Sequence, residues 1–266
     1  MIPRPDLPSG YRLHALESID STNDEARRLA GSGAADRTVV VAAIQTAGHG
    51  RRGRSWVSPR GNVFCSILLR PAGPPASLAQ LTFVAALATA DAIAAMGVPA
   101  RSVTLKWPND VLLNGGKVAG ILLEGSWQQG ASDGWVVIGI GINLAHHPDG
   151  LPYPVTSVAS AGGATGLDRC LGSLVAAIEV WLGRWEKQGF APIRAAWWDR
   201  ANDRFGPIRV KLDDSELEGR FAGIDHDGAL ILERPDGERR RIMAGDVLSA
   251  RPAGQPVGQP AGQKVD

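Results

Sequence analysis

The sequence predicts an α+β protein built from two parts. Strand-like apolar runs alternate with amphipathic helical patterns as far as about residue 206. From 208 to 250 only short strands remain, separated by turn signals, which is typical of a small β-barrel. We therefore expect a larger domain over 1–206 and a small domain over 207–251. Residues 252–266 should form a disordered tail, since they repeat Pro-x-Gly-Gln.

Local patterns place the helices and strands of the larger domain. A Ser-Thr pair followed by acids in the first turn indicates a helix with Ser21 or Thr22 as its N-cap. Asn114-Gly115-Gly116 lies between two apolar runs and predicts a β-hairpin. The expected strands are 39–45, 63–70, 103–113, 117–124 and 134–144. The expected helices are 22–30, 77–96 (capped by Ser77), 168–188 and 190–201.

Composition and charge argue against several classes of protein. The 266 residues carry a formal net charge of +1, which disfavours a generic nucleic-acid or membrane-surface binder. The two cysteines have no metal-ligand or disulfide spacing, and we expect neither a leader peptide nor an 18-residue apolar span. These observations together predict a cytoplasmic protein.

A glycine-rich, basic loop is the first candidate site. Gly48-His49-Gly50-Arg51-Arg52-Gly53-Arg54 lies within a stretch, between Asp36 and Asp91, that contains no carboxylate. Its Gly-x-Gly-x-x-Gly spacing suggests a dinucleotide fingerprint, but a helix and a following acid are missing, so we exclude that interpretation. Glycines and guanidiniums still suit a phosphate or a carboxylate. With few apolar side chains to anchor it, the loop should be mobile until an anion binds.

A second candidate site follows in Lys106-Trp107-Pro108-Asn109-Asp110 and in Lys117. Pro108 interrupts a strand, so Asn109 and Asp110 should lie at a bulge or strand end and face a cleft. Lys117 opens the next strand, just after the hairpin turn. Each of these residues alone could be an ordinary surface or turn residue.

Five motifs together resemble the biotin protein ligases in order and spacing. The resemblance extends from about residue 14 to 250. The motifs are Ile19-Asp20-Ser21-Thr22-Asn23, residues 45–54 (QTAGHGRRGR), Lys106-Trp107-Pro108-Asn109-Asp110, residues 117–122 (KVAGIL) and Gly139-Ile140-Gly141-Ile142-Asn143.

The resemblance implies a mixed sheet flanked by helices, in a catalytic domain like that of class II synthetases, with a C-terminal SH3-like barrel. It implies an enzyme that uses ATP and Mg²⁺ to form biotinyl-5′-AMP and pyrophosphate. The biotinyl group would then pass to a lysine of a biotin carboxyl carrier protein domain. The reaction requires cations placed in advance and a loop that excludes water.

By position, the resemblance also implies roles for individual residues. Lys117 and Arg51 would be catalytic, and Asp110 would lie near Mg²⁺. Biotin would contact Ser21, Thr22, Asn23, Gln45, His49, Gly50, Arg51, Lys117 and Leu122. The nucleotide would contact Gly48, Arg52, Arg54, Trp56, Asn109, Asp110 and Asn143. The family usually has Arg where this chain has His49, so a fixed cation is missing at that position.

Other interpretations remain open at this point. A lipoate-type ligase shares the general chemistry, and the arginine loop plus a β-barrel could be a nucleic-acid binding module. His146-His147 invites a metal site, although no Cys or carboxylate lies at ligand spacing. Because Ser21 lies so near the first residue, we expect no N-terminal DNA-binding domain and no repressor function.

Overall fold

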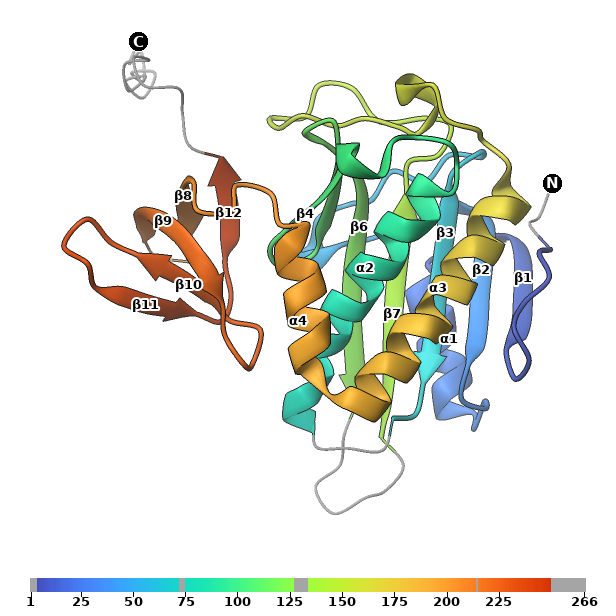
Figure 1. Cartoon of the computed structure of the whole chain (residues 1–266). Coiled ribbons are helices and arrows are strands. Elements are labelled where there is room, and N and C mark those ends of the chain that lie inside the picture. The colour runs from blue at the N-terminus through green and yellow to red at the C-terminus, as the bar shows by residue number, and fades with distance from the viewer. Residues whose placement is uncertain (1–3, 72–74, 127–133, 214, 250–266) are drawn as a thin grey trace, which may run out of the picture.

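The computed structural model describes residues 4–71, 75–126, 134–213 and 215–249. Seven strands form one mixed sheet in the order β1-β2-β3-β7-β6-β5-β4 (Figure 1). Only β1 and β2 are parallel, and every other neighbouring pair is antiparallel. The strands are β1 (Arg12–Ile19), β2 (Thr38–Gln45), β3 (Val63–Leu69), β4 (Val103–Lys106), β5 (Asp110–Leu113), β6 (Gly116–Ser126) and β7 (Trp135–Ile142).

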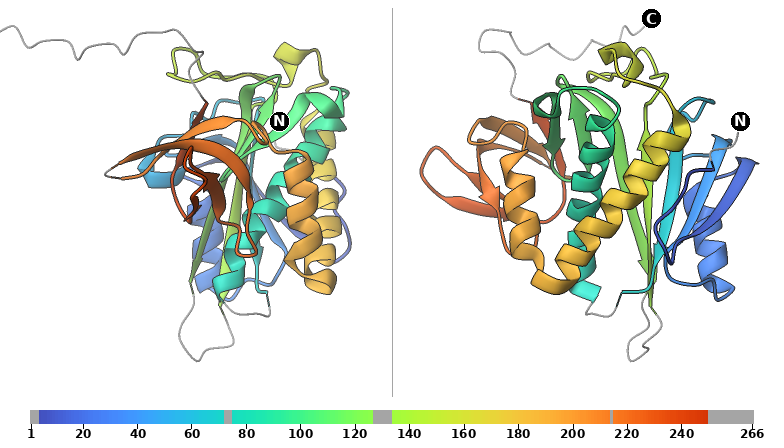
Figure 2. Two further views of the ribbon diagram at one scale, coloured as in Figure 1. Left: turned by 60° about the vertical axis from the view of Figure 1, so that its left-hand side comes forward. Right: turned by 45° about the vertical axis from the view of Figure 1, so that its right-hand side comes forward.

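Helices cover both faces of this sheet, as the left view of Figure 2 shows. Helix α1 (Thr22–Gly31) lies on one face, while α2 (Leu81–Ala94), α3 (Leu167–Gln188) and α4 (Phe190–Asp199) lie on the other. Side chains along a central strand therefore point alternately to the two faces of the sheet. Val39 and Val41 of β2 belong to the large core beneath α2 and α3, and Val40 belongs to the small core beneath α1. The expected mixed sheet flanked by helices is confirmed.

A five-stranded antiparallel sheet forms the C-terminal part of the chain. Its strand order is β11-β10-β9-β8-β12. Its strands are β8 (Pro207–Lys211), β9 (Glu216–Ile224), β10 (Leu230–Glu233), β11 (Arg239–Ile242) and β12 (Asp246–Ser249). The sheet shares a core with the larger domain, because Trp197 of α4 packs edge-on between Phe83 of α2 and Phe221 of β9. The predicted tail, 252–266, lies outside the described residues.

Several sequence-based expectations need correction. Strand β1 was not predicted, because its side chains are half-buried or exposed and show no simple alternation. Ser77 does not cap α2: it lies in a 3₁₀ turn, Pro75–Gln80, and α2 begins at Leu81. The single strand expected over 103–113 is two antiparallel strands, β4 and β5, joined through a turn that contains the cis peptide before Pro108.

The predicted helix start and hairpin are confirmed. Ser21 is the N-cap of α1, and its Oγ accepts the backbone N–H of Asp24 at 3.5 Å. Asn114 and Gly115 have positive φ values of 50° and 79° and connect β5 to β6 in a two-residue turn.

One segment contradicts the expectation that no apolar span is long enough to cross a membrane. Ser77–Ala94 has the length and mean hydropathy of such a span, 1.5 over 18 residues. However, 67% of that window is buried inside the protein. It includes α2, the helix that packs between the large sheet and α3, so its apolar character is that of a core helix.

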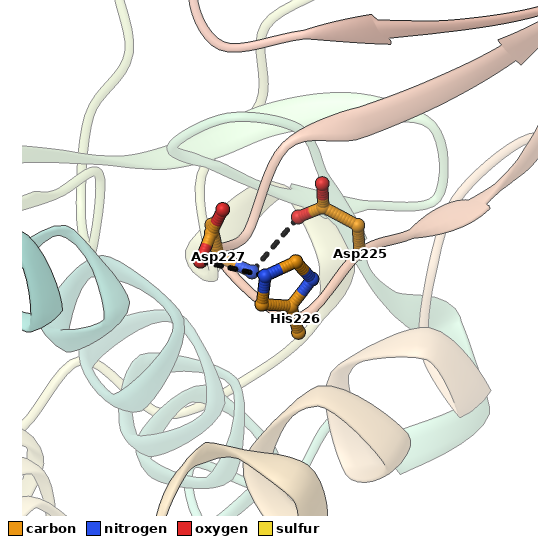
Figure 3. A group of neighbouring side chains, drawn as sticks. All are labelled: Asp225, His226 and Asp227. Carbon is orange, nitrogen blue, oxygen red and sulfur yellow. Dashed lines mark hydrogen bonds and ion pairs between the residues drawn. The ribbon is translucent and has the colours of Figure 1, made fainter.

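The turn between β9 and β10 places Asp225, His226 and Asp227 close together (Figure 3). Asp225 accepts the backbone N–H groups of Asp227 and Ala229, at 2.8 and 3.0 Å, and Arg241 pairs with both carboxylates. The two carboxylates therefore already have hydrogen-bond and ion-pair partners within the turn and on β11. The turn also joins the two domains, because Trp107 Nε1 donates to Gly228 O at 3.1 Å.

Candidate functional site

A cleft of about 830 Å³ lies on the sheet face that carries α1. It collects the predicted residues from four separate segments, 21–23, 45–56, 109–110 and 117–122. Those that line it are Ser21, Thr22, Asn23, Gln45, His49, Gly50, Arg51, Arg52, Arg54, Trp56, Asn109, Asp110, Lys117 and Leu122. Of the predicted set, Gly48 and Asn143 do not line it.

Glycines on β6 and β7 form the floor of this cleft. In β7, Ile138, Ile140 and Ile142 point into the core, so Gly139 and Gly141 face the cleft. A Cβ at Gly139 would lie 2.1 Å from Asn23 Oδ1, and one at Gly141 would lie 2.5 Å from the Trp56 indole. The glycines therefore let Asn23 and Trp56 lie directly on the backbone of the sheet.

Neutral polar groups gather at the α1 end of the cleft. Gln45 Oε1 accepts both the backbone N–H of Thr22, at 2.8 Å, and the Thr22 hydroxyl, at 3.0 Å. Buried Ser66 lies beneath them, with its Oγ 2.8 Å from Thr22 Oγ1 and 2.6 Å from Asn23 Oδ1. Ser21, Thr22 and Asn23 are themselves buried. This end suits an uncharged ligand group that both donates and accepts hydrogen bonds.

Lys117 and Asp110 form a close ion pair in the middle of the cleft. Lys117 Nζ lies 2.6 Å from Asp110 Oδ1, and Lys106 Nζ lies 3.8 Å from Asp110 Oδ2. Lys117 Nζ is also 5.5 Å from the centroid of the Trp56 ring. The backbone of Lys117 is fixed independently, because its N–H donates to Pro154 O and its carbonyl accepts the Thr156 N–H. The ammonium is therefore held at a defined place.

The glycine-rich loop is anchored, which corrects the expectation that nothing holds residues 48–54. Gly50 N–H donates to Arg54 O at 2.7 Å, and Trp56 N–H donates to Gly48 O at 2.9 Å. Arg51 donates to Asn109 Oδ1 at 3.3 Å. Arg54 forms an ion pair with Asp246 of the C-terminal sheet.

Arg51 is the least hydrated guanidinium of the loop. Burial lowers the pKa of Arg51, and the positive charges of Arg52 and Arg54 lower it further, while Asp246 and Asp110 oppose that change. A guanidinium keeps its proton at any physiological pH. A partly buried cation among like charges therefore favours an anion beside it.

Three predicted residues make contacts of their own, and of these only His49 lines the cleft. The Asn143 side chain is buried and donates to Thr156 O at 3.1 Å, outside the cleft. Gly48 is a packing position, since a Cβ there would lie within 2.8 Å of Ser58, Gln45 and Trp56 atoms. His49 lies at the cleft rim, 3.9 Å from Asp24 and 3.8 Å from Glu124, so its ring faces two carboxylates.

Several lining residues were not found from the sequence. Tyr153 reaches the cleft from the segment after β7, and its ring centroid is 5.9 Å from Lys117 Nζ. Arg209, Lys211 and Asp246 come from the C-terminal sheet. The sequence predicted only that these residues lie in short strands. A strand pattern does not show that the small domain borders the cleft of the larger one.

Two comparisons of the sequence agree with this arrangement. Residues 15–143 match the biotin/lipoate A/B protein ligase family, and residues 206–248 match the biotin protein ligase C-terminal domain. The chain is 46% identical over 238 residues to a biotin–[acetyl-CoA-carboxylase] ligase of Paracoccus denitrificans, covering 87% of this chain and 98% of that protein. It is 34% identical to the Mycobacterium tuberculosis ligase of the same name, covering 91% of each.

The fold is similar to that of a solved structure. Biotin protein ligase from Aquifex aeolicus, in complex with biotin and ATP, superposes with a TM-score of 0.75. The two sequences are 25% identical, and the superposition covers 91% of this chain and 98% of the other.

Proposed function

Because the chain belongs to the biotin protein ligase family, we propose that its cleft forms biotinyl-5′-AMP from biotin and ATP and then transfers the biotinyl group to a protein lysine. The protein is an ATP-dependent ligase that activates biotin and attaches it to protein. One observation supports this mechanism most directly. A neutral polar end, a central lysine and an arginine loop all line one cleft whose floor is formed by glycines. The acceptor we propose is a lysine of a biotin carboxyl carrier protein domain.

The polar end fits the ureido ring of biotin. That ring is uncharged and carries both N–H donors and a carbonyl acceptor, so it needs neutral partners of both kinds. Ser21, Thr22 and Asn23 at the start of α1, together with Gln45, supply them. Leu122 and the glycine floor leave an apolar path from this end toward Lys117.

The cations fit the chemistry of the first step. A carboxylate oxygen of biotin attacks the α-phosphorus of ATP, the bond to the β-phosphate oxygen breaks, and pyrophosphate leaves. Negative charge accumulates on the α-phosphate, so a cation held there in advance lowers the barrier. We propose that Lys117, in the middle of the cleft, is that cation, while Arg51, Arg52 and Arg54 of the loop line the same cleft.

In the second step an uncharged lysine amine of the carrier attacks the acyl carbon of biotinyl-5′-AMP. AMP leaves, an amide bond forms, and the lysine nitrogen loses a proton. The mixed anhydride between the steps is sensitive to water, so a covering loop protects it. We propose that residues 48–54, five of which line the cleft, form this covering loop.

Mg²⁺ would fit beside Asp110, in the middle of the cleft. The ion usually binds through one or two protein carboxylates together with substrate phosphates. Asp110 offers such a carboxylate, and the ammonium groups of Lys106 and Lys117 beside it would attract phosphate charge. We propose that Asp110 holds Mg²⁺, which would offset phosphate charge when bound.

We also propose that the enzyme is cytoplasmic and does not bind DNA as a repressor. Cys65 and Cys170 are free and buried, and burial raises the pKa of each thiol to about 12. Free thiols are usual in a reducing compartment. The net charge of +1 does not favour a DNA-binding surface.

Exchange of radiolabelled pyrophosphate into ATP tests the proposed function. We expect exchange that depends on biotin, because only formation and reversal of the adenylate move the label. Lipoate in place of biotin should give no exchange, since the polar end suits a ureido ring. Exchange with lipoate but not with biotin would show a lipoate-type ligase instead.

Trp56 leads to a second prediction, for Gly141→Ala. The indole rests on Gly120 and Gly141, and its Nε1 is buried with no hydrogen-bond partner among the described residues. We propose that this ring packs against the nucleotide. A methyl group at Gly141 would push the indole away, and a lost base–aromatic contact costs about 1–3 kcal/mol. We therefore expect the KM for ATP to rise about tenfold.

Gly183→Ala is the matched control for this variant. Nothing lies within 4 Å of a Cβ at Gly183, on α3 and away from the cleft. Its KM for ATP should equal that of the wild type. An unchanged KM in Gly141→Ala would show that the Trp56 ring does not contact the nucleotide.

A further inference from the structure

The carboxylate of Asp246 connects the C-terminal sheet to the arginine loop of the larger domain. Asp246 opens β12 of the C-terminal sheet and lies beside all three arginines of the loop. It forms an ion pair with Arg54, and its oxygens are 3.5 Å from Arg52 and 3.9 Å from Arg51. The Asp246 side chain is 24% exposed, so these pairs are partly shielded from water.

Residues of the C-terminal domain around Asp246 also contact the part of the loop with an unusual backbone conformation. Arg52 has a φ of 56°, a left-handed conformation that a side chain other than glycine seldom adopts. Its guanidinium reaches Asp213 at 2.8 Å as well as Asp246. Arg51 donates to Gly245 O at 3.5 Å, beside Asp246. Contacts with the C-terminal sheet therefore support an unfavourable loop conformation.

The charges explain why a carboxylate is needed at this place. Arg51, Arg52 and Arg54 put three positive charges within four residues, and Arg209 and Lys211 of β8 line the same cleft. Without a counter-charge these groups repel one another, and the loop would move toward solvent. Asp246 lies where it can offset the repulsion before any phosphate arrives.

We propose that Asp246 is a positioning residue for the adenylation reaction: it holds the three loop arginines over the nucleotide end of the cleft. The proposal rests on the proposed function. Each guanidinium has five N–H donors, so one group can contact Asp246 and still donate to a phosphate. The C-terminal sheet thus takes part in nucleotide binding through the loop. Asp246 itself does not contact the reacting atoms.

The test compares Asp246→Asn and Asp246→Glu with the wild type. Asp246→Asn keeps the size and removes the charge, so the loop should open in the ligand-free protein. The KM for ATP in pyrophosphate exchange should rise about tenfold, the usual scale for loss of a charge-assisted contact. Binding of biotin alone should change little, because the polar end is untouched. Asp246→Glu should recover most of the affinity for ATP.

Limited trypsin digestion gives a readout that is independent of activity. Cleavage after Arg51, Arg52 or Arg54 in the ligand-free protein should be several-fold faster in Asp246→Asn than in the wild type. Biotinyl-AMP should slow cleavage in both. Glu238→Gln is the matched control: it removes a carboxylate of the C-terminal domain that pairs with Arg234, is 58% exposed and does not line the cleft, so both cleavage and KM should stay close to wild type.

Two outcomes would overturn the role of Asp246. One is an Asp246→Asn protein with the trypsin sensitivity and KM of the wild type. The other is a lower KM for ATP, which would make Asp246 a competitor of phosphate. A wild-type protein without biotin-dependent exchange would refute the proposed function instead, and the trypsin comparison would still decide whether Asp246 holds the loop.

Discussion

Replacing Lys117 with alanine should lower the rate of biotin adenylation by about 10²–10³-fold, the usual cost of removing one preorganised electrostatic partner. The ammonium lies 2.6 Å from Asp110 and next to the Trp56 ring, between the polar end and the arginine loop. Its loss removes the central cation and leaves Lys106, at 3.8 Å, as the ion-pair partner of Asp110 among the described residues. The effect should fall on kcat, since charge develops in the transition state.

The fold should survive this change. The backbone of Lys117 is held by its hydrogen bonds to Pro154 and Thr156, and neither involves the side chain. Single-turnover formation of biotinyl-AMP measures the chemical step directly. Lys187→Ala is the matched control, because Lys187 is exposed in the last turn of α3; its adenylation rate should equal that of the wild type. A Lys117→Ala rate within about threefold of wild type would rule out the catalytic role.

Replacing Trp197 with alanine should destabilise the protein by about 3–5 kcal/mol, the range for a buried Phe or Trp. The side chain is 1% exposed and packs edge-on against Phe83 and Phe221. It therefore supports the core of the larger domain and the seat of the C-terminal sheet together. At about 2–4 °C per kcal/mol for a chain of this size, we expect Tm to fall by roughly 10 °C.

Thermal unfolding followed by circular dichroism measures this change. Val180→Ala is the control: the valine is 68% exposed on α3, so its removal should leave Tm almost unchanged. Because Asp246 reaches the loop only when the C-terminal sheet is seated, Trp197→Ala should also raise the KM for ATP below the unfolding transition. A Tm within about 2 °C of wild type would mean that the core closes around the missing ring.

Local patterns predicted the elements whose signals lie within a few residues. The Ser21 cap, the Asn114-Gly115 turn and the strand expected over 134–144 each depend on near neighbours, and all three are present in the structure. Strand β1 was missed because it is an edge strand with half-buried side chains. The cap at Ser77 was wrong because a 3₁₀ turn precedes α2, and serine followed by apolar residues fits either structure.

The sequence by itself determined the fold class and the family, and most of the site residues it predicted do line the cleft. Motifs such as residues 45–54 and Lys106–Asp110 are contiguous, so their chemistry can be recognised without coordinates. Only the tertiary structure decided that the arginine loop is anchored. Arg54 and Asp246 are 192 positions apart, and no local pattern relates two residues at that distance. Their meeting depends on how α4 and Trp197 seat the C-terminal sheet against the larger domain, and that packing is a property of the whole core.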